Sequence, residues 1–285
     1  MPRSTRYLSL LLLGASAALA LPRLGAGIWS RDNVDARDAA LTAGATGSVG
    51  VTPHAFYSSS VGVIGCKVDV NRMAYWPASI DCNDICISLK YAGRSVKLLR
   101  VDSSQGAYDV SYDAWNYLVF GKSATKDPQV GGAIAMDYEV LEPSECKSLL
   151  HTSGHKLPLS ASNSMNYLSN CLTEQPDSWV SKNYVLYNIQ DPVCSFGYDE
   201  TCTLDWPTQN TATCPHAVGY PNNLTASNKE DWVYDIEYGT GHLLLASTLQ
   251  PVDGSGSGRS DPRSLNPSVL VFLIGLISYE LMVSF

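Results

Sequence analysis

Two segments in which apolar and polar residues alternate constrain the fold of this chain more than any other feature. Residues 85–102, ICISLKYAGRSVKLLRVD, alternate in polarity and turn at Ala92-Gly93, which predicts a hairpin with one buried face. Residues 132–146, GAIAMDYEVLEPSEC, alternate in the same way and predict a long strand that closes the sheet. The earlier segment VGVIGCKVDV, 61–70, is β-branched and apolar and adds a further strand.

One short helix is predicted between the hairpin and the closing strand. Ser111 is a natural N-cap, Asp113 would complement the positive end of the helix dipole, and the run ends at Gly121. Trp115 lies on the apolar stripe of this helix, so we expect it in the core. Several short strands crossed by one helix within about 90 residues predict a compact β-barrel, and hence a mainly β fold.

Eight cysteines constrain the chain further. Their even number predicts four disulfides, whereas Cys82 and Cys86 could only be half of a zinc site, because no Cys/His pair at the matching spacing follows. Four cysteines lie in 66–146 and four in 171–214, which predicts two separately bridged units; each set permits three pairings. The eight are Cys66, Cys82, Cys86, Cys146, Cys171, Cys194, Cys202 and Cys214.

Both ends of the chain resemble targeting signals. Residues 1–20 combine two arginines, an apolar run and a closing Ala-Leu-Ala, which predicts a cleaved secretory signal rather than a membrane anchor. Residues 251–285 pass from small residues through a polar spacer to an apolar tail, the order of a glycosylphosphatidylinositol (GPI) attachment signal. Ser255 is the best attachment residue and Gly254 is nearly as good, while a transmembrane tail or a freely secreted form is the alternative.

The remaining chain divides into three predicted parts. Residues 21–56 lack sustained periodicity and are interpreted as a propeptide or flexible arm. Residues 57–150 hold the barrel, and residues 151–250 form a Cys-rich, loop-rich extension that packs on it. Within the extension, SASNSMNYLSNCL, 160–172, predicts a short helix and WVYDIEYGTGHLLLAS, 232–247, predicts one or two last strands.

Charge and single motifs narrow the function classes. The chain carries 27 acidic and 19 basic residues, so it lacks the basic surface that nucleic-acid binding requires. Asn223-Leu224-Thr225 is an N-glycosylation acceptor and predicts a surface loop. His151 and His155 are expected in a solvated loop rather than on a metal, no Ser/His/Asp order indicates a protease, and neither a metal nor another cofactor is expected.

The order of several motifs indicates a family. VKLLRVD leads through a Gly-containing loop to YDVS, then to AWNYLVFG and to the closing GAIAMDYEVLEPSEC. In this order residues 57–150 resemble the six-stranded double-psi β-barrel shared by barwin, expansins, rare-lipoprotein-A-like proteins and family-45 glycoside hydrolases. Together with the two terminal signals, the whole chain resembles an ascomycete cell-surface protein.

The resemblance assigns a role to Asp109. It stands where the enzymes of this superfamily keep the general acid and where expansins keep a carboxylate of the polysaccharide groove. A hydrolase that inverts the anomeric centre needs a second carboxyl about 6.5–9.5 Å away, for which Asp69 and Asp102 are the candidates. The structural alternative is that Asp109 only accepts backbone N–H bonds at the start of the helix, and Asp102 has the same ambiguity.

Aromatic residues supply candidate sugar contacts. Tyr75 and Trp76 precede a proline in a predicted loop, so their rings would stack on sugar faces if exposed, and Tyr108 beside Asp109 is a third candidate. The alternative is that these rings are partly buried, with one polar end in contact with water.

These observations combine into one main hypothesis and two alternatives. The main hypothesis is a secreted, lipid-anchored surface protein that binds or remodels cell-wall polysaccharide (β-glucan, chitin or cellulose) without hydrolysing it. The first alternative is an endoglucanase-like or lytic hydrolase with Asp109 as its acid. The second is a barwin-like protein-binding module, an inhibitor or effector, which predicts an exposed apolar patch instead of a sugar groove.

Overall fold

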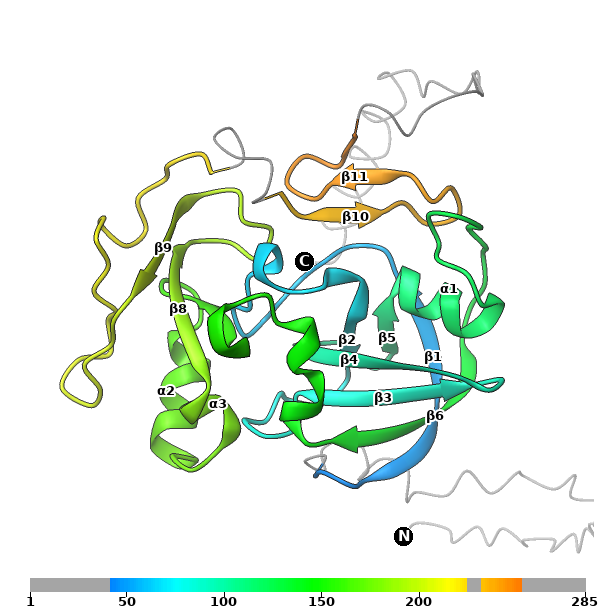
Figure 1. Ribbon diagram of the computed structural model, residues 1–285, viewed down its shortest axis with the longest axis horizontal. Helices are drawn as coiled ribbons and strands as arrows, with labels where there is room; N and C mark the ends of the chain where they lie inside the picture. Colours follow the sequence, from blue (N-terminus) through cyan, green and yellow to red (C-terminus); the bar gives the residue numbers. More distant parts are fainter. Residues whose placement is uncertain (1–41, 225–231, 253–285) are drawn as a thin grey trace, which may run out of the picture. The chain divides into compact units, whose positions relative to one another are not determined.

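A computed structural model describes residues 42–224 and 232–252, and six of its strands close into a barrel in the order β1-β5-β2-β4-β3-β6 (Figure 1). The strands are β1 Thr46–His54, β2 Met73–Trp76, β3 Cys86–Tyr91, β4 Arg94–Ser103, β5 Tyr108–Ser111 and β6 Ile134–Leu141. β1 is parallel to β5 and β2 to β4, whereas the other neighbouring pairs are antiparallel. The predicted mainly β fold with a six-stranded barrel is confirmed.

The barrel interior is filled by alternate residues of these strands and by one helix, α1 Tyr112–Phe120. Val51, Trp76 and Leu98 come from three different strands and are fully buried together with Trp115 of α1, as expected for that tryptophan. Burying a side chain of this size stabilises the fold by roughly 1.5–3 kcal/mol. The period-two pattern of the sequence therefore corresponds to one face of each strand turned toward a common core.

The prediction of a flexible arm is wrong for residues 46–54. These residues form β1, which pairs with β5 on one side and β6 on the other. Val49 and Val51 alternate with Gly50 and Thr52, but the glycines and Pro53 weaken the strand pattern in the sequence. Residues 1–41 lie outside the described part of the chain, as do the predicted attachment residues Ser255 and Gly254.

The start of α1 differs from its prediction, whereas its end agrees. Ser111 occupies the N-cap position, but its hydroxyl does not bond to the helix; it donates to the Val70 carbonyl at 2.7 Å and accepts from the Met73 N–H at 2.9 Å. Gly121 ends the helix with φ 81°, and its N–H bonds to the Tyr117 carbonyl at 2.8 Å. Ser111 therefore joins α1 to β2 instead of capping the helix.

The second half of the chain adds two small sheets and two helices (Figure 1). One sheet contains β7 Leu157–Ser160, β8 Tyr184–Ile189 and β9 Gly197–Cys202; the other contains β10 Tyr234–Ile236, β11 Leu243–Leu245 and β12 Gln250–Pro251. The helices are α2 Met165–Glu174 and α3 Trp179–Lys182, and short 3-10 turns occupy Gly65–Lys67, Val70–Arg72, Pro143–Leu149 and Ser153–His155. The helix predicted in 160–172 and the strands predicted in 232–247 are both present.

All eight cysteines are paired, but not as two separate units. Cys86 bonds to Cys146 within the barrel, and Cys202 bonds to Cys214 within the extension. The other two bridges cross between the parts, because Cys66 bonds to Cys194 and Cys82 bonds to Cys171. The prediction of separate units is wrong because one apolar core contains residues of both parts, so the two parts pack together in space.

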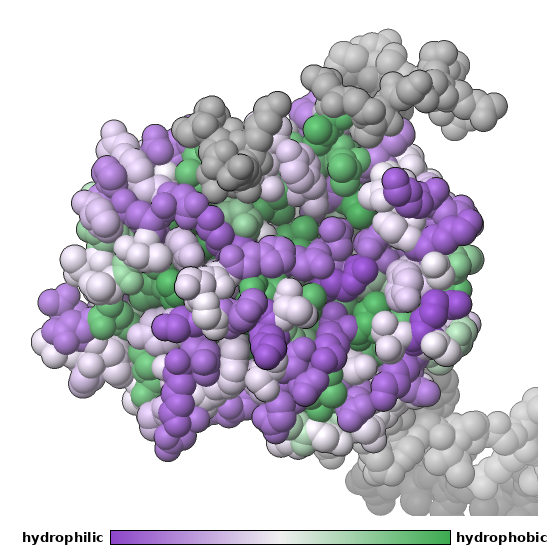
Figure 2. Space-filling view, in the orientation of Figure 1, coloured by the Kyte–Doolittle hydropathy of each residue, from purple (hydrophilic) through white to green (hydrophobic). Residues whose placement is uncertain are grey.

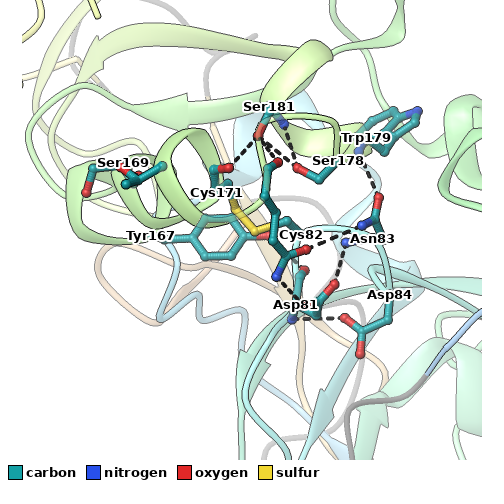
Figure 3. The surroundings of a disulfide bond; sticks show 12 residues. Asp81, Cys82, Asn83, Asp84, Tyr167, Ser169, Cys171, Ser178, Trp179 and Ser181 are labelled. Carbon is teal, nitrogen blue, oxygen red and sulfur yellow. Dashed lines mark hydrogen bonds between the residues drawn. A yellow bond between two sulfur atoms is a disulfide. The ribbon is translucent and has the colours of Figure 1, made fainter. Parts of the chain in front are cut away.

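Hydrogen bonds around the Cys82–Cys171 bridge fix the loop 79–84 against α2 and α3 (Figure 3). The Tyr167 hydroxyl donates to the Asp81 carbonyl at 3.1 Å, and the Trp179 N–H donates to the Asn83 side chain at 2.8 Å. The bridge therefore lies within a set of polar contacts that joins the barrel to the extension.

The same loop is held from the barrel side by a buried ion pair. Arg100 of β4 donates to Asp84 at 2.7 Å, and the two side chains are 0% and 2% exposed. Arg100 also donates to the Ala78 carbonyl at 3.1 Å, and Asp84 accepts the Asp81 N–H at 2.9 Å. Burial raises the pKa of Asp84 above its usual range, although Arg100 opposes this shift.

The molecular face shown in Figure 2 has hydrophilic side chains interleaved with small apolar areas. Such mixing is typical of a solvated protein surface, on which scattered apolar groups need no partner.

We predict that Asp84→Asn destabilises the protein by about 3–5 kcal/mol, because it leaves the Arg100 guanidinium buried without a counter-charge. Urea unfolding of the variant and the wild type measures the change. Glu139→Gln is the matched control, since it removes one partner of the exposed Lys90–Glu139 pair and should cost less than about 1 kcal/mol. Equal losses in the two variants would contradict the prediction.

Candidate functional site

Four residues from four adjacent strands form a row across the barrel. Thr52 of β1 is in register with Asp109 of β5, Asp109 with Tyr75 of β2, and Tyr75 with Asp102 of β4. Residues opposite one another in a sheet point to the same face, and Val110, the neighbour of Asp109, belongs to the interior core. This row, called the acidic row below, therefore lies on the outer face of the barrel.

Asp109 is half-buried, and its hydrogen-bond partner is a side chain. The Thr52 hydroxyl donates to the Asp109 carboxylate, and no backbone N–H of the described chain does so. The structural alternative, in which Asp109 accepts backbone N–H bonds at the start of α1, is therefore wrong. The reason is the register, because parallel pairing with β1 places a hydroxyl beside this carboxylate.

The structure brings only one of the two candidate partner carboxyls into the acidic row. Asp102 lies across Tyr75 from Asp109, so their α-carbons are about two strand spacings, roughly 9–10 Å, apart. Asp102 also accepts the N–H of Ser103 at 2.8 Å. Asp69 instead caps the Val70–Arg72 turn, where it accepts the Asn71 N–H at 3.1 Å.

The predicted aromatic platform is wrong for Tyr75 and Trp76. Both rings are buried, at 4% and 0% exposure, because they lie in β2 between β4 and β5 rather than in a loop before Pro77. The proline simply follows the end of the strand. Tyr108 is half-buried and packs edge-on against Trp76, with ring centroids 5.1 Å apart.

Asp113 and the two loop histidines also have defined positions. Asp113 is buried, pairs with Arg72 at 2.8 Å and accepts the Ala124 N–H at 2.8 Å, so it joins α1 to neighbouring segments as well as lying in its first turn. His151 and His155 are exposed, as expected for a solvated loop. In residues 42–224 and 232–252, no three His, Cys, Asp or Glu side chains are grouped to hold a metal.

Beside the acidic row, the outer face of the barrel contains a small recess whose enclosed space, about 10 Å³, has room for about one water-sized group. His54, Tyr75 and Ser111 line it from the barrel, Tyr57 lines it from the following segment, and Asp235 lines it from β10. We call it the β10 recess. Asp235 is only 5% exposed, and its Oδ1 accepts the Tyr57 N–H at 2.8 Å.

Sequence reasoning missed His54 and Asp235. The available signal was a single acidic residue inside the apolar pattern of WVYDI, 232–236, which indicates a carboxyl carried into a buried layer. No comparable signal marks His54, because its strand was itself not recognised.

Burial determines the acidity of Asp235. Desolvation raises its pKa to about 6, while the hydrogen bond from the Tyr57 N–H acts in the opposite direction. Across the described segments, no Lys, Arg or His lies within ion-pair distance of this carboxyl. Near neutral pH this carboxyl is therefore a buried negative charge with no cationic partner among residues 42–224 and 232–252.

Comparison with protein-family models gives no match, and a search of curated proteins gives none either. The four disulfides fit an extracellular protein, because cytosolic thiols are kept reduced. None of the helices in the described segments has the length and apolar content needed to span a bilayer. Asn223 is exposed, which agrees with the surface loop predicted from its motif.

We predict that Asp235 makes the protein less stable as the pH rises through about 6. The pKa of an aspartate is about 3.9 in an unfolded chain and is higher for Asp235 in the fold. The contribution of Asp235 to the free energy of unfolding is therefore fully present below about pH 3.9 and is lost as the folded group ionises. Relative to Asp235→Asn, the free energy of unfolding of the wild type should fall by up to about 3 kcal/mol between about pH 4 and pH 7.5, since a difference of one pKa unit corresponds to about 1.4 kcal/mol.

Urea unfolding of both proteins across this pH range measures the difference, so that titration of the other carboxyls cancels. The asparagine keeps an oxygen acceptor for the Tyr57 N–H. A difference that does not change with pH would show that Asp235 has no raised pKa.

Proposed function

We propose that this protein is secreted, is held at the cell surface by a GPI anchor, and binds or remodels cell-wall polysaccharide through an expansin-like or barwin-like barrel without hydrolysing it. The closed mixed six-stranded barrel is compatible with the double-psi topology of those families. The four disulfides support an extracellular location, and the two terminal sequence signals support secretion and anchoring.

The observation that carries the proposal is the acidic row. Thr52, Asp109 and Asp102 present hydroxyl and carboxylate groups on the outer face, and such groups can exchange hydrogen bonds with sugar hydroxyls. A carboxylate acceptor also makes stronger hydrogen bonds than a neutral group. Binding through this row requires no chemical step, which fits a non-hydrolytic protein.

One observation favours a second candidate, an inverting glycoside hydrolase. The estimated 9–10 Å between the α-carbons of Asp102 and Asp109 leaves room for carboxyl groups about 6.5–9.5 Å apart. In such an enzyme Asp109 would protonate the leaving oxygen, and Asp102 would activate water on the opposite side of the sugar. Tyr75, which separates the two residues, is covered by the chain and is unable to stack on a sugar.

Retention on insoluble chitin, β-glucan and cellulose tests the main proposal. We predict that wild type is retained on at least one of them without releasing soluble sugar. Asp109→Asn should weaken this retention about 10- to 100-fold, because a hydrogen bond to a charged group contributes roughly 1.5–3 kcal/mol. Asp177→Asn is the matched control, since it makes the same change at a carboxyl that is 96% exposed and lies in the extension.

The two candidates give different results in the same experiment. Sugar release that disappears in both Asp109→Asn and Asp102→Asn would replace the main proposal with the hydrolase. Absence of retention on all three polysaccharides would overturn the proposal.

A further inference from the structure

The β10 recess is continuous with the acidic row. His54 and Ser111 form the next in-register pair on the same face after Thr52 and Asp109, so the two pairs are about 7 Å apart along the strands. Tyr75 belongs to both places, because it pairs with Asp109 and also lines the recess. A ligand bound at Asp109 would therefore lie beside the opening of the recess.

Aromatic side chains make up much of the recess wall. Tyr75 and the His54 ring are in contact, with centroids 4.7 Å apart. The aromatic residues that line the recess are His54, Phe56, Tyr57, Tyr75, Tyr112 and Tyr234. Faces of aromatic rings carry partial negative charge and attract cations. The wall is thus suited to a positively charged group.

The two carboxyls of the recess have different partners. Asp113 is neutralised by Arg72 at 2.8 Å. Asp235 accepts the Tyr57 N–H through Oδ1, while its Oδ2 has no hydrogen-bond partner within the described chain. Because a buried carboxylate without a counter-charge is costly, a cation that entered the recess would gain a strong interaction with Oδ2.

Size and ligand number indicate the kind of cation. The enclosed space of the recess, about 10 Å³, has room for about one water-sized group and is far smaller than the roughly 300–1,000 Å³ of pockets that enclose whole small molecules. It can therefore take only the tip of one substituent of a larger ligand, and an ammonium group has about this size. Calcium and magnesium prefer several oxygen ligands, whereas one carboxylate surrounded by aromatic rings suits an organic ammonium group.

We propose that the β10 recess binds a primary ammonium group and thereby selects polysaccharide whose amino sugars carry a free amine, such as glucosamine, over acetylated or neutral sugars. This inference rests on the proposed polysaccharide-binding function, of which it defines the substrate class. Asp235 supplies the counter-charge, and the acidic row holds the neighbouring part of the sugar chain.

The proposal requires binding to depend on pH. Ionisation of Asp235 near pH 6 creates the counter-charge, while the amine must still carry its proton, so binding is expected to be strongest between the pKa of Asp235 and that of the amine. Within the part of the chain that the structure describes, the titratable or charged residues around Asp235 are His54 on β1, Tyr57, Arg72, Tyr75 on β2, Asp102 on β4, Tyr112 and Asp113 on α1, and Tyr234 on β10.

Calorimetric titration of the whole secreted chain with soluble oligomers of glucosamine, N-acetylglucosamine and glucose tests the inference. At about pH 7 and a salt concentration that screens surface charges, wild type should bind the glucosamine oligomer about tenfold more tightly than the acetylated one. The preference should fall to about twofold or less in Asp235→Asn, and also in wild type at about pH 5.

Asp177→Asn is again the matched control, because it removes the same unit of negative charge and should keep the full preference. Equal affinity of wild type for the glucosamine and acetylated oligomers would overturn the inference. A preference that survives in Asp235→Asn, or that is lost equally in Asp177→Asn, would overturn it as well, because general charge attraction would then explain the binding.

Failure of this inference is distinguishable from failure of the proposed function. Retention on polysaccharide that depends on Asp109 but not on Asp235 or on the amine would leave the proposed function intact and remove the ammonium site. The opposite outcome is Asp235-dependent binding of the glucosamine oligomer without retention on any insoluble polysaccharide. It would support the ammonium site and overturn the proposed function.

Discussion

Closure of the barrel by β1 is the constraint on which the rest of the structure depends. β1 completes the hydrogen bonding of both β5 and β6, so no open edge is left between them. Its parallel register with β5 also decides which residues meet on the outer face, because it places Thr52 beside Asp109 and His54 beside Ser111. A shift of one residue would turn these side chains into the core and move Val51 out of it.

The extension depends on this barrel for its position and in turn completes the recess. Two disulfides cross between the parts, and the Arg100–Asp84 pair holds the loop that carries one of the bridged cysteines. A buried pair of this kind is weak support for stability in itself, but loss of either partner is costly. It therefore favours one arrangement of the loop, against which α2 and α3 are fixed.

The sequence predicts those parts of the fold that depend on local pattern. β3, β4 and β6 alternate strictly enough to be recognised, and Gly121 marks the end of α1 because a left-handed residue is needed there. β1 was missed because glycines and a proline interrupt its alternation. The loop prediction for Trp76 is wrong because a proline is found both within loops and directly after the last residue of a buried strand.

The candidate site is less predictable because its residues meet through long-range pairing. The motif identifies Asp109, but its contact with Thr52 spans 57 residues, and the bond between Asp235 and Tyr57 spans 178. The crossing disulfides are hidden for the same reason, since the spacing of cysteines along a chain does not determine their spacing in the fold. Local patterns fix strands, whereas the register of barrel closure fixes the site.

Asp109 on the barrel and Asp235 on β10 illustrate how environment separates the chemical roles of two carboxyls. Asp109 is half-buried, receives a hydroxyl hydrogen bond and lies in a row of polar groups, an arrangement that leaves its side chain available to hydrogen-bonding ligands. Asp235 is buried among aromatic rings with a single backbone donor, so its charge is poorly solvated until a cation arrives. The first carboxylate therefore suits contacts with any sugar hydroxyl, whereas the second can distinguish a charged substituent from a neutral one. Under the proposed function, a surface that combines both would hold a sugar chain through common groups and distinguish its substituents through one buried charge.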